Sequence, residues 1–419
     1  MKKYLFIAEK PSLMIDVQSV YKKNQSLIMQ QVGTIDFTAL AGHVCQLVPP
    51  NGYDAWKGRW EELELPMIPK QFKIQVIPGK EKMVNNLKKQ ITKEHYDGFI
   101  VGTDADIEGN GTYYLLQAYL NLKKENTLRF FEHSLTENEI LKSLLSMTGF
   151  WTTPQHVHMT EAFLIRSHMD WLIGMNFTVG FTIRSKNIMR VGRVKTPTLK
   201  LIYDNCESID HFVPKKDYEI KVTYQDSFSG ILLSEDLKSN QKFETELEAK
   251  QFIQESLADC ATVESIEQKK ETLVPSPLYK LSDLQTEAGN LYGFSPAYVL
   301  ELVQSLYETH KIVSYPRTDC RYISTEKAME FSKLLQSMKC FPELESFVSS
   351  ITEKQIKKVQ SNQRIVNDKE VQKSSHDALL PTGKKPNISN LNEDEKRICL
   401  LIYKRLLAFF LPPLLQEKA

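Results

Sequence analysis

Three carboxylates follow one short apolar run and could together hold a metal ion. Asp104, Asp106 and Glu108 stand in the segment TDADIEG, directly after the run GFIVG. In an extended backbone residues i and i+2 point the same way, so we expect Asp104 and Asp106 to project together. Carboxylate oxygens suit Mg²⁺, which usually takes one or two of them plus water and phosphate oxygens. The same residues also fit a solvated turn with helix-capping acids.

A fourth carboxylate strengthens the metal interpretation. Glu9 ends another apolar run, Tyr4–Ala8, and Lys10 follows it directly. Open α/β sheets bind ligands at the carboxyl ends of their strands. If the two apolar runs form neighbouring strands, Glu9 faces the two aspartates. Acidic residues at two such strand ends together indicate a metal site far more specifically than a D-x-D motif alone.

A tyrosine beside a proline and an arginine is a candidate nucleophile. Tyr315 stands in SYPRTD, and Arg317 lies two residues further on. A single tyrosine is usually a core or interface residue, and a phenol with a pKa near 10 is a poor nucleophile. An arginine, which is always charged, would stabilise phenolate character. Tyrosine is a known covalent nucleophile. His376 is a further candidate, although a lone histidine is more often structural.

A basic segment could contact phosphates. Residues 184–195, RSKNIMRVGRVK, hold five cations and no acid, and Thr-Pro-Thr follows them. Cations and hydroxyls of this kind suit a phosphate backbone. The alternative is a solvated helix end. The candidates for nucleic-acid contact are Arg184, Arg190, Arg193, Lys195 and Thr198.

The elements around these residues predict a chain of several domains. Strand-like and helix-like runs alternate over residues 1–145, which favours a parallel α/β domain. Residues 150–208 have helical spacing, and the alternation of YEIKVTY, residues 218–224, indicates a more β-rich module. Helical patterns return at Leu278. Residues 351–375 are rich in polar side chains and predict an exposed loop or a solvated helix.

Composition excludes several classes of protein. The chain has 419 residues, which suggests two to four domains, and a net charge of +1, which excludes a histone-like cationic coat. The apolar stretch from Leu406 to Leu415 is broken by two prolines, so it is too short to span a membrane. The N-terminus lacks a signal-peptide core. We therefore expect a cytoplasmic protein with no membrane contact.

Ordered motifs along almost the whole chain resemble the type IA DNA topoisomerases, most closely bacterial topoisomerase III. The motifs are FIAEKPS at 6–12, GH at 42–43, TDADIEG at 103–109, MDWLIGMN at 169–176, VGRVKTPTL at 191–199, PSPLYKLSDLQTEA at 275–288, SYPRTDCRY at 314–322 and HDALLPT at 376–382. A TOPRIM primase or nuclease is a weaker alternative, because such enzymes do not need the tyrosine motif.

The resemblance implies a fold of several parts. We expect a multidomain α/β plus α protein with a β-rich arch segment, an N-terminal TOPRIM domain and a toroid core that is incomplete at the C-terminus. The implied domains are a TOPRIM α/β domain (1–148), the first part of a helical base domain (149–208), a β-rich arch segment (209–272) and a helical catalytic-tyrosine domain (273–419).

The resemblance also implies residue roles. Tyr315 would form a 5′-phosphotyrosine bond, with Arg317 beside it and His376 near the cleavage site. Lys10 would contact the scissile phosphate, and Glu9 is a candidate acid for the leaving oxygen. Mg²⁺ would be held by Glu9, Asp104, Asp106 and Glu108. The substrates would be single-stranded and negatively supercoiled DNA. The covalent bond conserves phosphodiester energy, and the sequence has no G-x-x-x-x-G-K-[ST] loop, so we expect no ATP requirement.

Departures from the family pattern leave an alternative open. The usual run D-x-D-R-E-G-E has Ile107 and Asn110 in place of the arginine and the last acid, and Lys195 replaces a common glutamine. Family members are commonly longer, and the second segment of the arch is missing here. A truncated DNA-binding remnant that cannot complete strand passage is the alternative. A missing C-terminal segment or a helicase partner would supply what this chain lacks.

Overall fold

The computed structural model describes residues 1–224, 228–256, 262–263, 265–266, 268–374 and 376–418. These residues form two compact units. One unit contains Met1–Val191 and Thr272–Leu414, and the other contains Gly192–Glu271 and the residues from Leu415 on. The candidate nucleophile and the four candidate acids all lie in the first unit.

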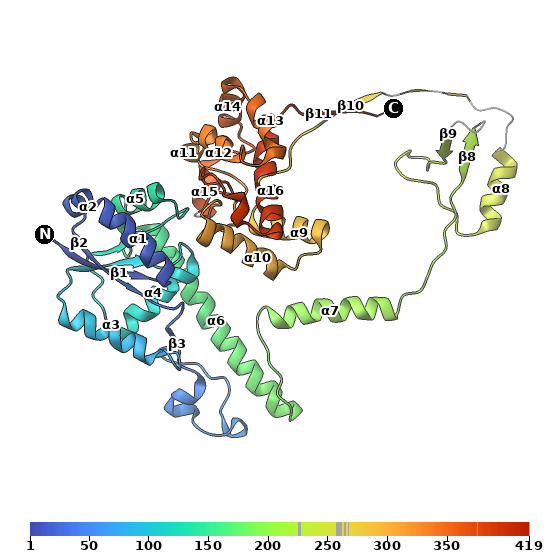
Figure 1. Ribbon diagram of the computed structural model, residues 1–419. Coiled ribbons are helices and arrows are strands. Elements are labelled where there is room, and N and C mark those ends of the chain that lie inside the picture. Colours follow the sequence, from blue (N-terminus) through green and yellow to red (C-terminus); the bar gives the residue numbers. More distant parts are fainter. Residues whose placement is uncertain (225–227, 257–261, 264, 267, 375, 419) are drawn as a thin grey trace. The chain divides into compact units, whose positions relative to one another are not determined.

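A five-stranded sheet with the order β2-β1-β5-β6-β7 organises the N-terminal part of the first unit (Figure 1). Its strands are β1 (Lys3–Ala8), β2 (Thr34–Ala39), β5 (Gly98–Gly102), β6 (Thr127–Arg129) and β7 (Thr148–Gly149). Neighbouring strands are parallel except β6 and β7. Strands β1 and β5 pair directly, which confirms that the apolar runs before Glu9 and Asp104 are neighbours.

Side-chain alternation in β1 separates two cores. Tyr4 and Phe6 pack with residues of α1 and α5, whereas Leu5 and Ile7 pack with residues of α3 and α4. The elements around the sheet are α1 (Pro11–Lys23), α2 (Gln25–Gln31), α3 (Glu81–Lys93), α4 (Ile107–Leu120), α5 (Glu137–Leu145) and the antiparallel pair β3 (Cys45–Leu47) and β4 (Ile74–Val76). Strands with helices on both faces confirm the expected parallel α/β domain.

The long helix α6 (Pro154–Ser185) packs against α4 at a point where only a glycine fits. A Cβ atom on Gly111 of α4 would lie 2.1 Å from the ring of Phe163. Further along α6, Trp171 and Val179 join a small separate core with Met67 and its neighbours. No helix in the described ranges is both long and apolar enough for a membrane crossing.

The C-terminal part of the first unit is helical. Its elements are α9 (Leu281–Tyr292), α10 (Pro296–Ser305), a π-helical turn (Leu306–His310), α11 (Thr325–Ala328), α12 (Phe331–Met338), α13 (Pro342–Ser350), α14 (Glu353–Gln360), α15 (Asp368–Ser374) and α16 (Glu393–Leu407). Helix α10 packs on α9 and α16. Of the loop or solvated helix expected in residues 351–375, the structure shows mainly helix, in α14 and α15. Residue 375 lies outside the described residues.

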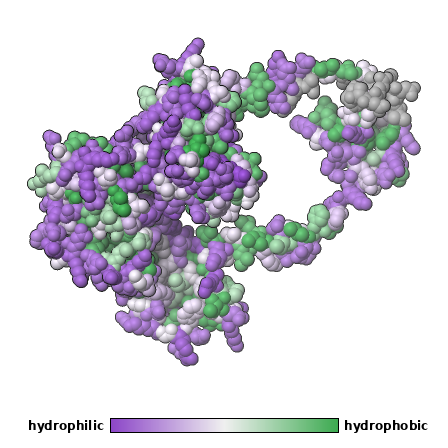
Figure 2. All heavy atoms as spheres, viewed as in Figure 1, coloured by the Kyte–Doolittle hydropathy of each residue, from purple (hydrophilic) through white to green (hydrophobic). Residues whose placement is uncertain are grey.

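The second unit contains few buried residues. Its elements are α7 (Lys195–Asp210), β8 (Lys221–Tyr224), β9 (Phe228–Ile231), α8 (Glu246–Ser256) and most of β10 (Lys269–Leu273) and β11 (Leu414–Lys418). Strands β8 and β9 form an antiparallel hairpin, and β8 confirms the strand expected in residues 218–224. Apolar side chains such as Leu199 and Ile202 are exposed along α7 (Figure 2).

We expect Gly111→Val to lower the free energy of unfolding by about 1–3 kcal/mol, because the new side chain must displace the Phe163 ring. Urea unfolding measures the change. Gly174→Ala in α6 is the matched control, since its Cβ would meet no atom closer than 3.7 Å. The control should be neutral or slightly stabilising, as alanine favours a helix interior. Equal stabilities of the two variants would contradict close packing of α4 on α6.

Candidate active site

The carboxyl ends of β1 and β5 bring Glu9 next to Asp104. The backbone N–H of Asp104 donates to Glu9 Oε2 at 2.9 Å. Burial and then the charge of Asp104 raise the pKa of Glu9 to about 7. A carboxyl group with such a pKa can hold or release a proton near neutral pH, as general acid–base chemistry requires.

The two aspartates do not project together, so that prediction is wrong. Strand β5 ends at Gly102, and the next residues form a turn in which the N–H of Asp106 donates to the carbonyl of Asp104 at 2.8 Å. Asp104 contacts Lys10 Nζ at 3.2 Å. Asp106 is the N-cap of α4 and accepts from the Gly109 N–H at 2.7 Å. The i, i+2 rule fails because this backbone is not a strand, and the helix-capping alternative holds for Asp106.

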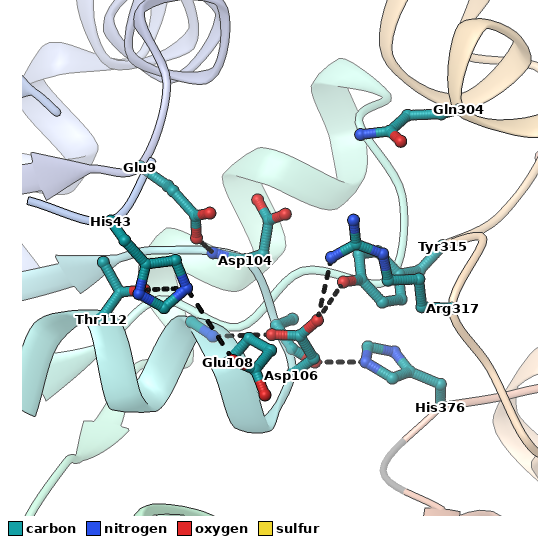
Figure 3. A network of polar contacts seen from close by, with 12 residues as sticks. Glu9, His43, Asp104, Asp106, Glu108, Thr112, Gln304, Tyr315, Arg317 and His376 are labelled. Carbon is teal, nitrogen blue, oxygen red and sulfur yellow. Dashed lines mark hydrogen bonds and ion pairs between the residues drawn. The ribbon is translucent and has the colours of Figure 1, made fainter. Parts of the chain in front are cut away.

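The tyrosine of the SYPRTD motif meets the capping aspartate. The Tyr315 hydroxyl donates to Asp106 Oδ2 at 2.8 Å, and Arg317 Nη1 lies 3.7 Å from the same oxygen (Figure 3). The Tyr315 side chain is buried, with 3% of its surface exposed. Burial and then the charge of Asp106 raise the pKa of Tyr315 far above its ordinary value. The phenol therefore keeps its proton, and an Asp106 oxygen is the hydrogen-bond acceptor in contact with it.

Backbone pairing places His376 against the tyrosine. The Ser314 N–H donates to the Leu380 carbonyl at 2.8 Å, so the segment before Tyr315 runs beside the segment that carries His376. The two rings stack with centroids 4.6 Å apart. His376 Nε2 bonds to the carbonyl of Ala105, and burial lowers the pKa of His376 to about 3. A neutral imidazole that donates from Nε2 thus links Tyr315 to the turn at residues 103–106, which we call the acidic turn.

Two polar residues near Lys10 were missed by the sequence reasoning. Lys10 Nζ contacts Glu308 Oε1 at 2.9 Å, and Gln304 Nε2 donates to the same oxygen at 2.8 Å. Glu308 lies in the π-helical turn Leu306–His310. The only signal in the sequence was a charged residue at the end of an apolar helix. That pattern is ordinary for a solvated turn, so it pointed to no function.

The four candidate metal ligands share oxygen chemistry but do not converge. Glu108 makes an ion pair with Arg166 of α6, and His43 Nε2 lies 3.8 Å from its carboxylate. In the described parts of the chain, no group of three or more His, Cys, Asp or Glu side chains is arranged to hold a metal ion. Glu9 lies next to Asp104, the charges of Asp104 and Asp106 both act on it, and carboxylates are the ligand type of Mg²⁺, so these residues still fit a hard cation.

A groove of about 740 Å³ ends at the acidic turn. Asp106 and His376 line it. Ile107, the first residue of α4, also lines it and is exposed. The cations that line it are Arg166, Lys280, Arg317, Arg321 and Lys373. Asp319 and Glu370 also line it, and Arg321 is paired with Asp283. Glu108, which pairs with Arg166, lines the groove as well, and Arg317 and Lys373 also contact carboxylates, so the cations of the groove are largely balanced by acids.

The candidate residues of the basic segment are all exposed. Arg184 and Arg190 belong to the first unit. Arg193, Lys195 and Thr198 belong to the second unit, and the Thr198 hydroxyl donates to the Val194 carbonyl at 2.8 Å. The segment leads from α6 into α7, so it includes a helix end, as the alternative expected. Exposure keeps all five residues accessible to a phosphate backbone.

Asn110, which stands where the family pattern has an acid, is fully buried and supports the turn. Arg129 Nε donates to Asn110 Oδ1 at 3.0 Å, and Asn110 Nδ2 donates to the His156 carbonyl at 3.1 Å. Arg129 also donates to the carbonyls of Thr103 and Asp104, at 2.7 and 2.6 Å. The amide can accept and donate at once, which a carboxylate cannot do. Arg129 and Asn110 together fix the backbone that carries the acids.

Comparison with known proteins decides the family. Residues 154–419, more than half of the chain, match the family model described as DNA topoisomerase, and residues 4–133 match the Toprim domain. The chain belongs to the type IA DNA topoisomerase family. The DNA topoisomerase 3 of Shouchella clausii is 31% identical over 99% of this chain, and that of Bacillus subtilis is 30% identical over 98%. The chain spans about 55% of the length of each of these curated relatives.

A solved structure has the same fold. The full-length topoisomerase I of Thermotoga maritima superposes with a TM-score of 0.66 and is 24% identical. The match covers 99% of this chain and 62% of the Thermotoga chain. The N-terminal Toprim domain and the type IA core expected from the sequence are thus confirmed as the fold.

We expect His156 to contribute a fall in the free energy of unfolding as pH decreases from about 6.5 to 4, whereas the raised pKa of Glu9 contributes in the opposite direction. Burial and the charge of Arg129 lower the pKa of His156 to about 4 in the folded chain. The unfolded chain therefore binds a proton first, and acid favours unfolding by up to about 1.4 kcal/mol per pH unit. Urea titrations between pH 4 and 7 should show a smaller slope for His156→Gln. The exposed His211→Gln should keep the original slope, and an unchanged slope in both would contradict the prediction.

Proposed function

We propose that this chain is a type IA DNA topoisomerase that cleaves one DNA strand with Tyr315, allows strand passage and reseals the break without ATP. The observation that carries the proposal is the 2.8 Å hydrogen bond from the Tyr315 hydroxyl to Asp106 of the acidic turn. It joins a nucleophile and a base from two motifs 209 residues apart. The names of the two relatives, each DNA topoisomerase 3, support the same activity.

The side chains supply each part of strand cleavage. The Tyr315 oxygen attacks the phosphorus while its proton passes to Asp106, and the bond from phosphorus to the 3′ oxygen breaks. Glu9, with a pKa of about 7, supplies the proton that the 3′ oxygen takes up. Arg317 and Lys10 stabilise the added charge on the phosphorus oxygens. The products are a 5′-phosphotyrosine bond to Tyr315 and a free 3′-hydroxyl on the other end of the cleaved strand.

Resealing is the reverse of cleavage. The 3′-hydroxyl attacks the phosphorus and gives its proton to Glu9, the bond from phosphorus to the Tyr315 oxygen breaks, and the proton on Asp106 returns to Tyr315. Because the covalent bond keeps the phosphodiester energy, no ATP is consumed. Glu9, Asp104 and Asp106 would hold Mg²⁺, with Glu108 close to them in the sequence. When bound, the ion would supply positive charge that orients the free 3′ end.

The substrates we propose are single-stranded and negatively supercoiled DNA. The groove cations and the exposed residues of the basic segment would track phosphates, so binding should weaken as salt rises. We further propose the domains inferred from the sequence, namely TOPRIM (1–148), base (149–208), arch (209–272) and tyrosine domain (273–419), and a cytoplasmic site of action. A further C-terminal segment or a helicase partner would complete strand passage.

A covalent adduct tests the proposal directly. We expect the purified chain with 3′-labelled single-stranded DNA and Mg²⁺ to give a labelled protein band after denaturation by SDS. Tyr315→Phe should abolish the band, because it removes the attacking oxygen. Tyr298→Phe, which removes an exposed hydroxyl in α10, is the matched control and should retain it.

Two negative outcomes have different meanings. Salt-sensitive binding of single strands by a folded chain without any adduct would favour the DNA-binding remnant and refute cleavage. An adduct that persists in Tyr315→Phe would assign the nucleophile to another residue.

Metal removal should separate cleavage from resealing. We expect EDTA to leave adduct formation unchanged. After a jump to high salt, reversal of the adduct should be at least tenfold slower in EDTA than in Mg²⁺. Asp104→Asn should behave likewise and should weaken Mg²⁺ binding in a calorimetric titration. Asp97→Asn, at an exposed position before β5, is the control. Unchanged reversal in EDTA would contradict a role for Mg²⁺ in resealing.

A further inference from the structure

Glu132 is a buried acid near the nucleophile that the mechanism above does not use. It lies three residues beyond β6 and is 1% exposed. Its Oε1 lies 3.5 Å from the Tyr307 hydroxyl, at the outer limit of a hydrogen bond. Its Oε2 has no hydrogen-bond partner in the described structure. Buried polar groups are normally paired, so a half-satisfied carboxyl group at this place needs an explanation.

The partner of Glu132 packs directly on the nucleophile. Tyr307 lies in the π-helical turn and is 5% exposed. Its ring meets the Tyr315 ring edge-on, with centroids 5.6 Å apart and an interplanar angle of 86°. Such edge-to-face pairs have a preferred geometry. A shift of Tyr307 would therefore move the phenol of Tyr315.

The residue after Glu132 holds the nucleophile through its backbone. The Tyr315 N–H donates to the His133 carbonyl at 3.2 Å. Two consecutive residues of the Toprim domain thus support Tyr315, one through its main chain and one through Tyr307. A displacement of about 1 Å at a reacting atom can slow a reaction 100-fold, so such supports influence the rate.

Burial favours the neutral form of Glu132, whereas the charge of Arg129 favours its ionised form. The groups that act on it are Arg129 of β6, Asp104 and Asp106 of the acidic turn, and Tyr307. Arg129 directs its hydrogen bonds to Asn110 and to backbone carbonyls. Burial, opposed by Arg129, raises the pKa of Glu132 to about 8. At neutral pH the carboxyl group carries no charge that would oppose Asp106.

We propose that Glu132 is a positioning residue for the reaction, which holds the Tyr307 ring that sets the Tyr315 phenol against Asp106. The inference rests on the proposed function for its kinetic consequence. The positioning itself is a property of the folded chain without DNA. Ionisation of Glu132 would place a third negative charge near Asp104 and Asp106 and would disturb this arrangement.

Single-turnover cleavage of 3′-labelled single-stranded DNA tests the role in three variants. Glu132→Leu keeps the volume but loses the polar contact, and it should slow adduct formation about tenfold with unchanged affinity for the DNA. Tyr307→Phe should show a similar loss, and the double variant should be no slower than either single variant. Glu132→Gln should restore the rate at pH 7. At pH 9, where ionisation of Glu9 slows every variant, Glu132→Gln should lose less of its pH 7 rate than the original chain. Glu125→Leu, at an exposed position, is the control.

A second measurement does not depend on activity. With ¹³C-labelled tyrosine, the NMR signal of Tyr315, assigned by Tyr315→Phe, should be sharp and alike in the original chain and in Glu132→Gln. It should shift or broaden in Glu132→Leu. The inference is overturned if all variants share one rate and one Tyr315 signal, or if glutamine is as harmful as leucine. If the original chain forms no adduct, the proposed function fails, and the Tyr315 signal alone decides the positioning role.

Discussion

The hydrogen bond between Tyr315 and Asp106 is the contact on which the rest of the site depends. Asp106 can accept it because its other oxygen caps α4, which fixes the carboxylate at the start of a helix. Tyr315 can make it because the segment before it pairs with the segment that carries His376. The contact joins an α/β domain to a helical domain, and each supplies half of a reactive pair.

The backbone of the acidic turn needs its own support, and a buried cation supplies it. Arg129 is 1% exposed and donates to several carbonyls around the turn. A buried guanidinium is stable only when its donors are satisfied. Asn110 completes that set without adding a charge next to the carboxylates. Asn110, a departure from the family motif, therefore has a structural place in the interior, where it bonds to Arg129 and to the His156 carbonyl.

The sequence predicted the sheet edge well and the side-chain geometry poorly. Apolar runs before Glu9 and Asp104 indicated strands, and the preference of α/β folds for ligands at strand ends placed these residues together. The prediction for Asp106 failed because it assumed that the strand continued. Glu308 and Glu132 were missed because their partners, Lys10 and Tyr307, are remote in sequence. Motifs indicate which residues could react, whereas contacts between segments remote in sequence show which residues support them.

Burial of Tyr315 has a consequence for how fast such a site can work. With 3% of its surface exposed, the Tyr315 phenol meets a phosphate only after the residues that cover it move. Asp106 belongs to the α/β part of the first unit and Tyr315 to its helical part, so uncovering Tyr315 requires a movement of one part against the other. The frequency of this opening sets an upper limit on turnover, whatever the barrier of the chemical step. In the closed state the nucleophile is shielded from stray electrophiles as well as from water.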